Sequence, residues 1–107
     1  MKRIEILGYK WDVDFVAPDD KKLEGNDGIC WYNKRLMFIR NDVNKTTKEC
    51  ILRHELVHAI LDVQGRHYQR KFGKEEVCEF IAYLNPIITK LVKEVMRNER
   101  KPIQKTQ

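Results

Sequence analysis

The stretch that decides the fold is residues 46–65, TTKECILRHELVHAILDVQG. Its apolar residues recur at helical spacing and form one side of an amphipathic helix: Leu52, Leu56, Ala59, Ile60 and Val63. Thr46 and Glu49 have the spacing of a capping box, and Gly65 can adopt the left-handed backbone conformation that closes many helices. The stretch therefore predicts a helix that has Thr46 as its N-cap and runs to Gln64.

The other side of this helix carries His54, Glu55 and His58. At about 100° per residue the two histidines lie about 40° apart, one turn along the same face, so both imidazoles can bind one ion. Neutral imidazole ligands leave zinc able to lower the pKa of its bound water towards about 7. Glu55 lies about 60° beyond His58, badly placed as a ligand of the same ion but close enough to take a proton from that water. The pattern predicts one zinc ion on His54 and His58, with Glu55 as general base.

A catalytic zinc ion also needs a third protein ligand and one open position. The metzincin spacing is excluded, because it would require glycine and histidine where the chain has Leu61 and Gln64. Glu75 and Glu79 lie four residues apart on one face of a second predicted helix, so one can bind the metal while the other accepts the second ring N–H of a histidine ligand. We favour Glu75 as the third ligand. The alternatives are Glu76, His67 and Cys50.

Hydrolysis further requires a hydrogen-bond donor that faces the developing oxyanion. The side chains that could supply it are His67, Tyr68, Tyr32 and Tyr83. Each of these is of a type that more often packs or lies on the surface. We favour Tyr68 or His67 as the catalytic donor.

The segments before the motif helix predict strands. Residues 4–16 alternate apolar and polar side chains on either side of Gly8, which predicts two strands joined by a turn. Residues 28–32 and 36–39 predict a hairpin that leads towards the motif helix. Residues 18–27 are rich in Asp, Lys, Gly and Asn, so we expect an exposed loop there.

The segments after the motif helix predict further helix. A second helix is expected from Gly73 or Lys74 through Leu84, and its core side is expected to comprise Val77, Phe80, Ile81 and Leu84. Pro86 lacks a backbone N–H and should kink or end this helix. A third helical segment is expected from the apolar repeat Ile87, Ile88, Leu91, Val92 and Val95.

At 107 residues the chain fits one domain, which we place at residues 1–96, followed by a basic, disordered tail at residues 97–107. The tail carries +3 of the net charge of +5, so the body is only weakly charged and the composition argues against nucleic-acid binding. Three cysteines without close pairs fit small buried thiols in a reducing compartment better than disulfides. Glu5 interrupts the apolar stretch that a secretory signal needs, and no window is apolar enough to span a membrane. We therefore expect a cytoplasmic protein.

Residues 54–61, HELVHAIL, and residues 75–82, EEVCEFIA, together resemble the gluzincin-type small metallopeptidases of phages and prophages that are related to the ImmA/IrrE group. The resemblance covers residues 46–84. In that family the second helix offers Glu-x-x-x-Asp or Glu-x-x-x-Asn, which implies Glu75 as the third zinc ligand and Glu79 as the support of a histidine ligand. Glu79 is longer than the family's Asp or Asn, so it could itself become the ligand.

The resemblance implies a minimal zincin-like α+β domain, in which a small antiparallel sheet of about three to four strands packs on the motif helix and the second, Glu-bearing helix. It also implies that a peptide substrate lies along an edge strand, for which Arg35 to Arg40 is our candidate. The expected function is zinc-dependent hydrolysis of peptide bonds in an intracellular protein, such as a repressor. The alternative is a non-catalytic zincin-fold protein, an antirepressor or phage accessory factor, that acts by binding a partner.

Overall fold

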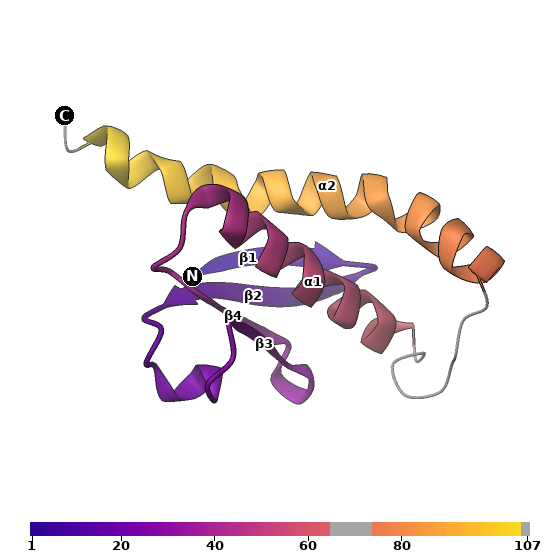
Figure 1. The fold of residues 1–107 in the computed structure, drawn as a ribbon, viewed down its shortest axis with the longest axis horizontal. Helices are drawn as coiled ribbons and strands as arrows, with labels where there is room; N and C mark the ends of the chain where they lie inside the picture. The colour runs from indigo at the N-terminus through magenta and orange to yellow at the C-terminus, as the bar shows by residue number, and fades with distance from the viewer. Residues whose placement is uncertain (65–73, 106–107) are drawn as a thin grey trace.

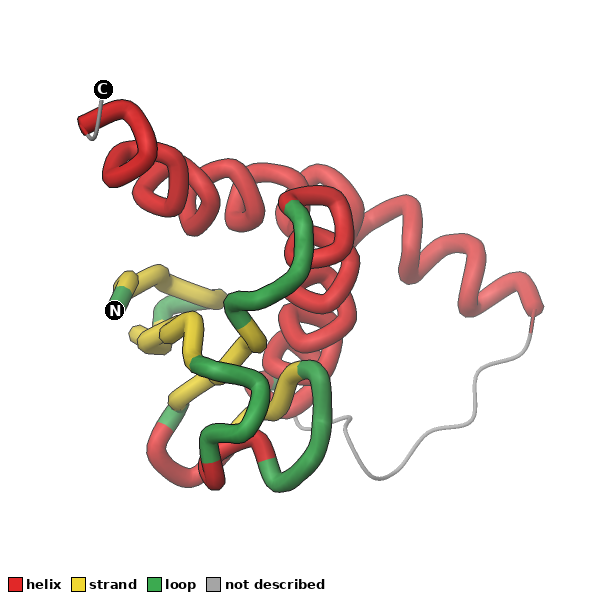
Figure 2. The backbone as a smooth tube through the Cα atoms, turned by 60° about the vertical axis from the view of Figure 1, so that its left-hand side comes forward, coloured by secondary structure: helices red, strands yellow, loops and turns green. Residues whose placement is uncertain are grey.

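The computed structural model describes the backbone of residues 1–64 and 74–105, and the side chains of residues 1–64 and 81–97. Its elements, in chain order, are β1 (Lys2–Ile6), β2 (Tyr9–Val16), η1 (Lys21–Leu23), β3 (Gly28–Trp31), η2 (Tyr32–Lys34), β4 (Leu36–Arg40), α1 (Lys45–Val63) and α2 (Lys74–Lys105), where η marks a short 3-10 helix. The strands form one sheet, and both α-helices lie on the same side of it (Figure 1, Figure 2). The expected α+β class is confirmed.

The core fills the space between one face of the sheet and the two α-helices. The sheet and α1 contribute side chains that are at most 2% exposed: Ile4, Ile6, Trp11, Val13, Met37, Ile39, Leu52, Leu56, Ala59 and Ile60. The α1 members of this set are those that the helical periodicity predicted. Val63, the remaining predicted member, lies at the end of the helix and is only partly buried.

The hairpin of β1 and β2 has the predicted turn at Gly8. Ile6 pairs with Tyr9, so the loop consists of Leu7 and Gly8, whose φ angles are 49° and 90°. Two positive φ angles define a type I′ turn, which matches the right-handed twist of the strands on either side. Gly8 adopts such a φ without a steric penalty, whereas Leu7 has to tolerate it.

The sheet is mixed, so the expectation of an antiparallel sheet is wrong. Its strand order is β1-β2-β4-β3, and β2 pairs with β4 in parallel. After β2 the chain forms β3, which lies one strand position away from β2. It then turns back through η2 and forms β4 in the position between β2 and β3. Because β3 and β4 form an antiparallel hairpin, β4 then runs in the same direction as β2.

Within this hairpin β3 is the edge strand and β4 is the inner strand. The expectation that Arg35 to Arg40 forms the edge is therefore wrong as well. The physical reason is burial of β4 on both faces. Met37 and Ile39 face the helices, while Phe38 packs on the opposite face with Val16 and Leu23. An apolar strand covered on both faces gains most in an inner position, where both of its backbone edges are also paired.

The loop between β2 and β3 is exposed as expected, apart from the half-buried Asp20 and the buried Leu23. Its residues 21–23 form η1, and Leu23 is 0% exposed. The Asp20 side chain accepts a hydrogen bond from the Lys22 N–H at 2.8 Å and starts this turn. Leu23 thereby covers the face of the sheet that the α-helices leave open.

Helix α1 begins two residues earlier than the capping-box prediction placed it. The N-cap is Asn44, whose Oδ1 accepts a hydrogen bond from the Thr47 N–H at 2.8 Å. Thr46 lies inside the first turn, and Glu49 is 4.0 Å from the Lys45 Nζ across one helical turn. Asparagine is a better N-cap than threonine, so the helix starts after Asn44 and not after Thr46.

Helix α2 runs continuously through Pro86 to Lys105, so the proline does not end it, and the expected second and third segments are one helix. Figure 1 shows a bend in its first third. The structure also has helix within residues 97–105, where the sequence suggested a disordered tail. No helix among the described residues has the length and apolarity needed to cross a bilayer.

Among the described side chains of α2, which are those of residues 81–97, one face is buried. Its buried members are Leu84, Ile88, Leu91, Val92, Val95 and Met96. Ile81, which was expected on the core side, is 58% exposed. Figure 1 shows the first turns of α2 projecting past the ends of the strands, where the sheet does not cover them. Val77 and Phe80 have side chains outside the described residues.

At Gly28 the backbone of β3 lies close to side chains of α1. A Cβ added to Gly28 would lie 2.7 Å from the Ile51 Cγ2 and 3.1 Å from the Glu55 Cγ. No such contact arises at Gly8 or Gly25. The strand can therefore lie against the helix only because residue 28 has no side chain.

Replacing Asn44 by alanine should lower the free energy of unfolding by about 1 kcal/mol, because the Thr47 N–H loses its side-chain acceptor. Thr46→Ala, at the position that the capping-box pattern favoured, should change it by less than about 0.5 kcal/mol. Urea unfolding followed by circular dichroism measures both variants. An equal or larger loss in Thr46→Ala would contradict Asn44 as the cap.

Gly28→Ala should destabilise the fold by about 1–3 kcal/mol, because the new methyl group overlaps the Ile51 side chain. The matched control is the double variant Gly28→Ala with Ile51→Ala. Removing the Ile51 methyl groups makes room, so the two changes should cost less together than the sum of their separate effects. Additive losses in the same urea experiment would show that β3 and α1 do not meet at this point.

Candidate metal and catalytic site

The two histidines of α1 come together as the helical spacing predicted. The His54 Nε2 and the His58 Nε2 are 3.2 Å apart, and the ring centroids are 4.8 Å apart with planes at 68°. His54 is exposed and His58 is half-buried. Lone pairs on two facing ring nitrogens repel, so atoms at this distance require a proton or a metal ion between them.

The donor atoms fit a tetrahedral zinc ion. With Zn–N bonds of about 2.0–2.1 Å and tetrahedral angles, two imidazole nitrogens on one zinc lie about 3.3 Å apart. The separation of 3.2 Å between the two Nε2 atoms agrees with that value. Imidazole is also a ligand type that zinc prefers.

The third ligand is not decided by these contacts. Glu75, Glu76 and Glu79 lie in α2, but their side chains fall outside the described residues. Among the side chains that are described, no group of three or more His, Cys, Asp or Glu residues gathers as a metal site. Glu75 therefore stays a prediction from the sequence, and so does the supporting role of Glu79.

Among the described residues, Glu55 is the one charged residue that is buried, and it is 7% exposed. It lies on α1 directly beneath β3, where Gly28 leaves room for its carboxylate. Helix geometry keeps it next to His54 while directing it to a different side of the helix. A carboxylate held away from bulk water beside a pair of histidines has a position from which it could act as a general base next to a metal ion.

Cys30 of β3 contacts Glu55 at two atoms. Its Sγ lies 3.3 Å from the Glu55 carbonyl oxygen and 3.4 Å from the Glu55 Oε1. Burial raises the pKa of the Cys30 thiol, and the negative charge of Glu55 raises it further. The sulfur therefore keeps its proton at neutral pH and acts as a donor.

A hollow of about 300 Å³ adjoins this base. Its lining residues come from the start of β3, the loop before it and α1: Asn26, Asp27, Gly28, Ile51, His54 and Glu55. The Asp27 carboxylate accepts a hydrogen bond from the Arg40 guanidinium at 2.8 Å, which fixes the loop beside the strand. The hollow gives His54 and Glu55 a common opening.

The four side chains expected as possible oxyanion donors lie in different parts of the chain. His67 and Tyr68 lie outside the described residues. Tyr83 is 62% exposed on α2. The Tyr32 ring packs edge-on against Trp11, with centroids 6.4 Å apart, so it contributes to the core. The oxyanion donor therefore stays a prediction from the sequence.

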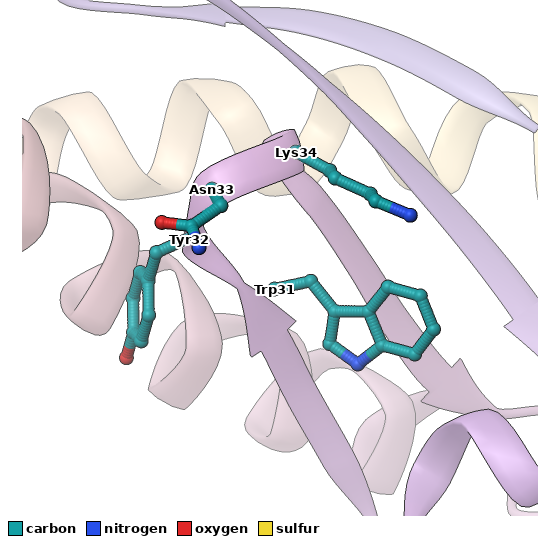
Figure 3. A pocket seen from close by; sticks show the side chains of 4 residues that line it. All are labelled: Trp31, Tyr32, Asn33 and Lys34. Carbon is teal, nitrogen blue, oxygen red and sulfur yellow. The ribbon is translucent and has the colours of Figure 1, made fainter.

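Tyr32 also lines a second hollow, of about 330 Å³, with Trp31, Asn33 and Lys34 at the end of β3. Figure 3 shows the Trp31 and Tyr32 side chains leaving the chain in opposite directions. Trp31 packs edge-on against Phe38, on the sheet face away from the α-helices. Trp31 and Tyr32 therefore pack on opposite faces of the sheet.

Cys50, an alternative third ligand, is exposed one turn before His54, so the expectation of a buried thiol is wrong at this position. Cys30 and Gly28 were not foreseen as parts of the site. The alternation of a strand puts residues 28 and 30 on one face and residues 29 and 31 on the other. That signal was available in the sequence, but it could not say that α1 covers this face at Glu55.

Comparisons of the chain with protein-family models, with curated proteins and with solved structures give no match. The assignment of a function therefore depends on the geometry of α1 and β3.

Proposed function

We propose that this protein is a zinc-dependent metallopeptidase with a minimal zincin-like fold. The observation that carries the proposal is the separation of 3.2 Å between the His54 and His58 ring nitrogens, with the buried Glu55 carboxylate on the neighbouring residue. In this proposal one face of α1 carries the two histidine ligands, and the side that faces β3 carries the base. Glu75 of α2 completes the ligand set in this proposal, as the sequence spacing favours.

The residues divide the reaction between them. When bound, zinc supplies Lewis acidity, which acidifies water and polarises a carbonyl. His54, His58 and Glu75 would hold the ion, with the two imidazoles adding no charge and the carboxylate adding one negative charge. Glu55 accepts a proton from the attacking water as the new C–O bond forms, and it returns the proton to the nitrogen as the C–N bond breaks. The products are a carboxylic acid and an amine.

The edge strand supports a peptide as the substrate. One side of β3 pairs with β4, and its other side has no partner strand among the residues that the structure describes. Unpaired N–H and C=O groups on an edge can bind an extended peptide as an additional strand. Because Gly28 and Cys30 of this strand lie against Glu55, a peptide bound there would pass close to the base.

Wild-type protein, purified without chelator, should contain about one zinc ion per chain, and His54→Ala or His58→Ala should lose it. Elemental analysis measures the metal content. Cys50→Ala is the matched control, since this exposed side chain on the same helix should leave the zinc content unchanged. Glu75→Ala, Glu76→Ala and Glu79→Ala should identify the third ligand, with loss expected in Glu75→Ala. A metal-free wild type would contradict the proposal.

Glu55→Gln should retain zinc and lose cleavage by about 10²–10⁴-fold, because the amide cannot accept the proton. The measurement is the release of fluorescent fragments from unfolded, fluorescein-labelled casein, with zinc content determined on the same samples. Glu49→Gln, a similar change elsewhere on α1, serves as the control. If Glu55→Gln cleaves casein as fast as the wild type, the protein is not a peptidase of this type, and partner binding along β3 becomes the better assignment.

A further inference from the structure

Cys30 is the one hydrogen-bond donor to the Glu55 carboxylate within the described part of the chain. Its Sγ lies 3.4 Å from Oε1 and 3.3 Å from the carbonyl oxygen of the same residue. The single thiol proton can be given to one of these acceptors or shared between them. Both acceptors belong to Glu55, so either arrangement ties the edge strand to this residue.

The carboxylate is confined on its other side by Gly28. A Cβ built on Gly28 would lie 3.3 Å from the Glu55 Oε2 and 3.1 Å from its Cγ, so the strand backbone borders this oxygen closely. Cys30 meets Oε1 two residues further along the strand. Two positions on one face of β3 thus border the two oxygens of one carboxylate, and Cys30 donates a hydrogen bond to one of them.

A glutamate side chain has several rotatable bonds, and fixing it costs conformational entropy. A buried carboxylate without a donor also loses hydration that nothing replaces. A thiol is a weak donor, so it can orient the carboxylate with little loss of the carboxylate's ability to accept a proton. Cys30 therefore has the chemistry of a group that aims a base.

We propose that Cys30 is a positioning residue, which donates its S–H to the Glu55 Oε1 and holds the base in the orientation it needs. This inference rests on the proposed peptidase function. Cys30 does not itself touch the substrate in this scheme. It makes the edge strand part of the catalytic apparatus, beyond its role in binding a peptide.

The kinetic test compares Cys30→Ala, Cys30→Ser and Cys50→Ala with the wild type in peptide cleavage. Cys30→Ala should lower kcat by about tenfold, the usual value of one hydrogen bond, with KM and zinc content unchanged. Cys30→Ser keeps a donor and should restore most of kcat. Cys50→Ala should match the wild type. If Cys30→Ala has wild-type kcat, or if Cys30→Ser is as slow as Cys30→Ala, the positioning role is wrong.

A spectroscopic test needs no peptidase activity, so it separates this inference from the proposed function. The infrared S–H stretching band of Cys30 is identified by its loss in Cys30→Ala or, should that variant not fold, in Cys30→Ser. A carboxylate acceptor lowers the stretching frequency more than a carbonyl acceptor does. Glu55→Ala should therefore shift the band to higher frequency, with Glu49→Ala as the control. A band that does not move in Glu55→Ala would place the proton on the backbone carbonyl and overturn the inference.

Discussion

The close approach of β3 to α1 at Gly28 is the constraint on which the rest of the site depends. A side chain at residue 28 would collide with Ile51, and the strand would have to move away from the helix. Glu55 would then face solvent and lose its contact with Cys30. The glycine therefore governs three properties together: the packing of the sheet on the helix, the burial of the base, and the distance between that base and the sheet edge.

The topology of the sheet explains why β3 is available to make this contact. Apolar residues on both faces of β4 favour an inner position for that strand, so the hairpin leaves β3 at the edge. An edge strand has one side without a partner strand, and in this protein β3 also borders the helix that carries His54 and His58. In the function that we propose, peptide binding and the orientation of Glu55 use the same short strand. The helix α2 closes the core behind α1 and carries the glutamates that the sequence assigns to the metal.

The sequence predicted those features of the fold that depend on local spacing. Helical periodicity identified the buried side of α1, and the four-residue separation of His54 and His58 predicted that their rings meet. The turn at Gly8 followed from strand alternation around a residue that tolerates positive φ. Local reasoning failed where two good signals competed, as at the N-cap, where Asn44 rather than Thr46 accepts the first hydrogen bond. The expected end of the helix at Pro86 was also wrong, because one missing backbone donor does not stop a helix whose later residues pack on the core.

By itself the sequence determined which side chains share a face of α1, because the spacing of residues along a helix fixes their directions whatever surrounds it. Only the tertiary structure decided the strand order, the parallel pairing of β2 with β4, and the burial of Glu55 under Gly28 and Cys30. These features join residues far apart in the chain. They depend on which faces are covered once all the elements pack together, and that is a property of the whole core rather than of any one segment.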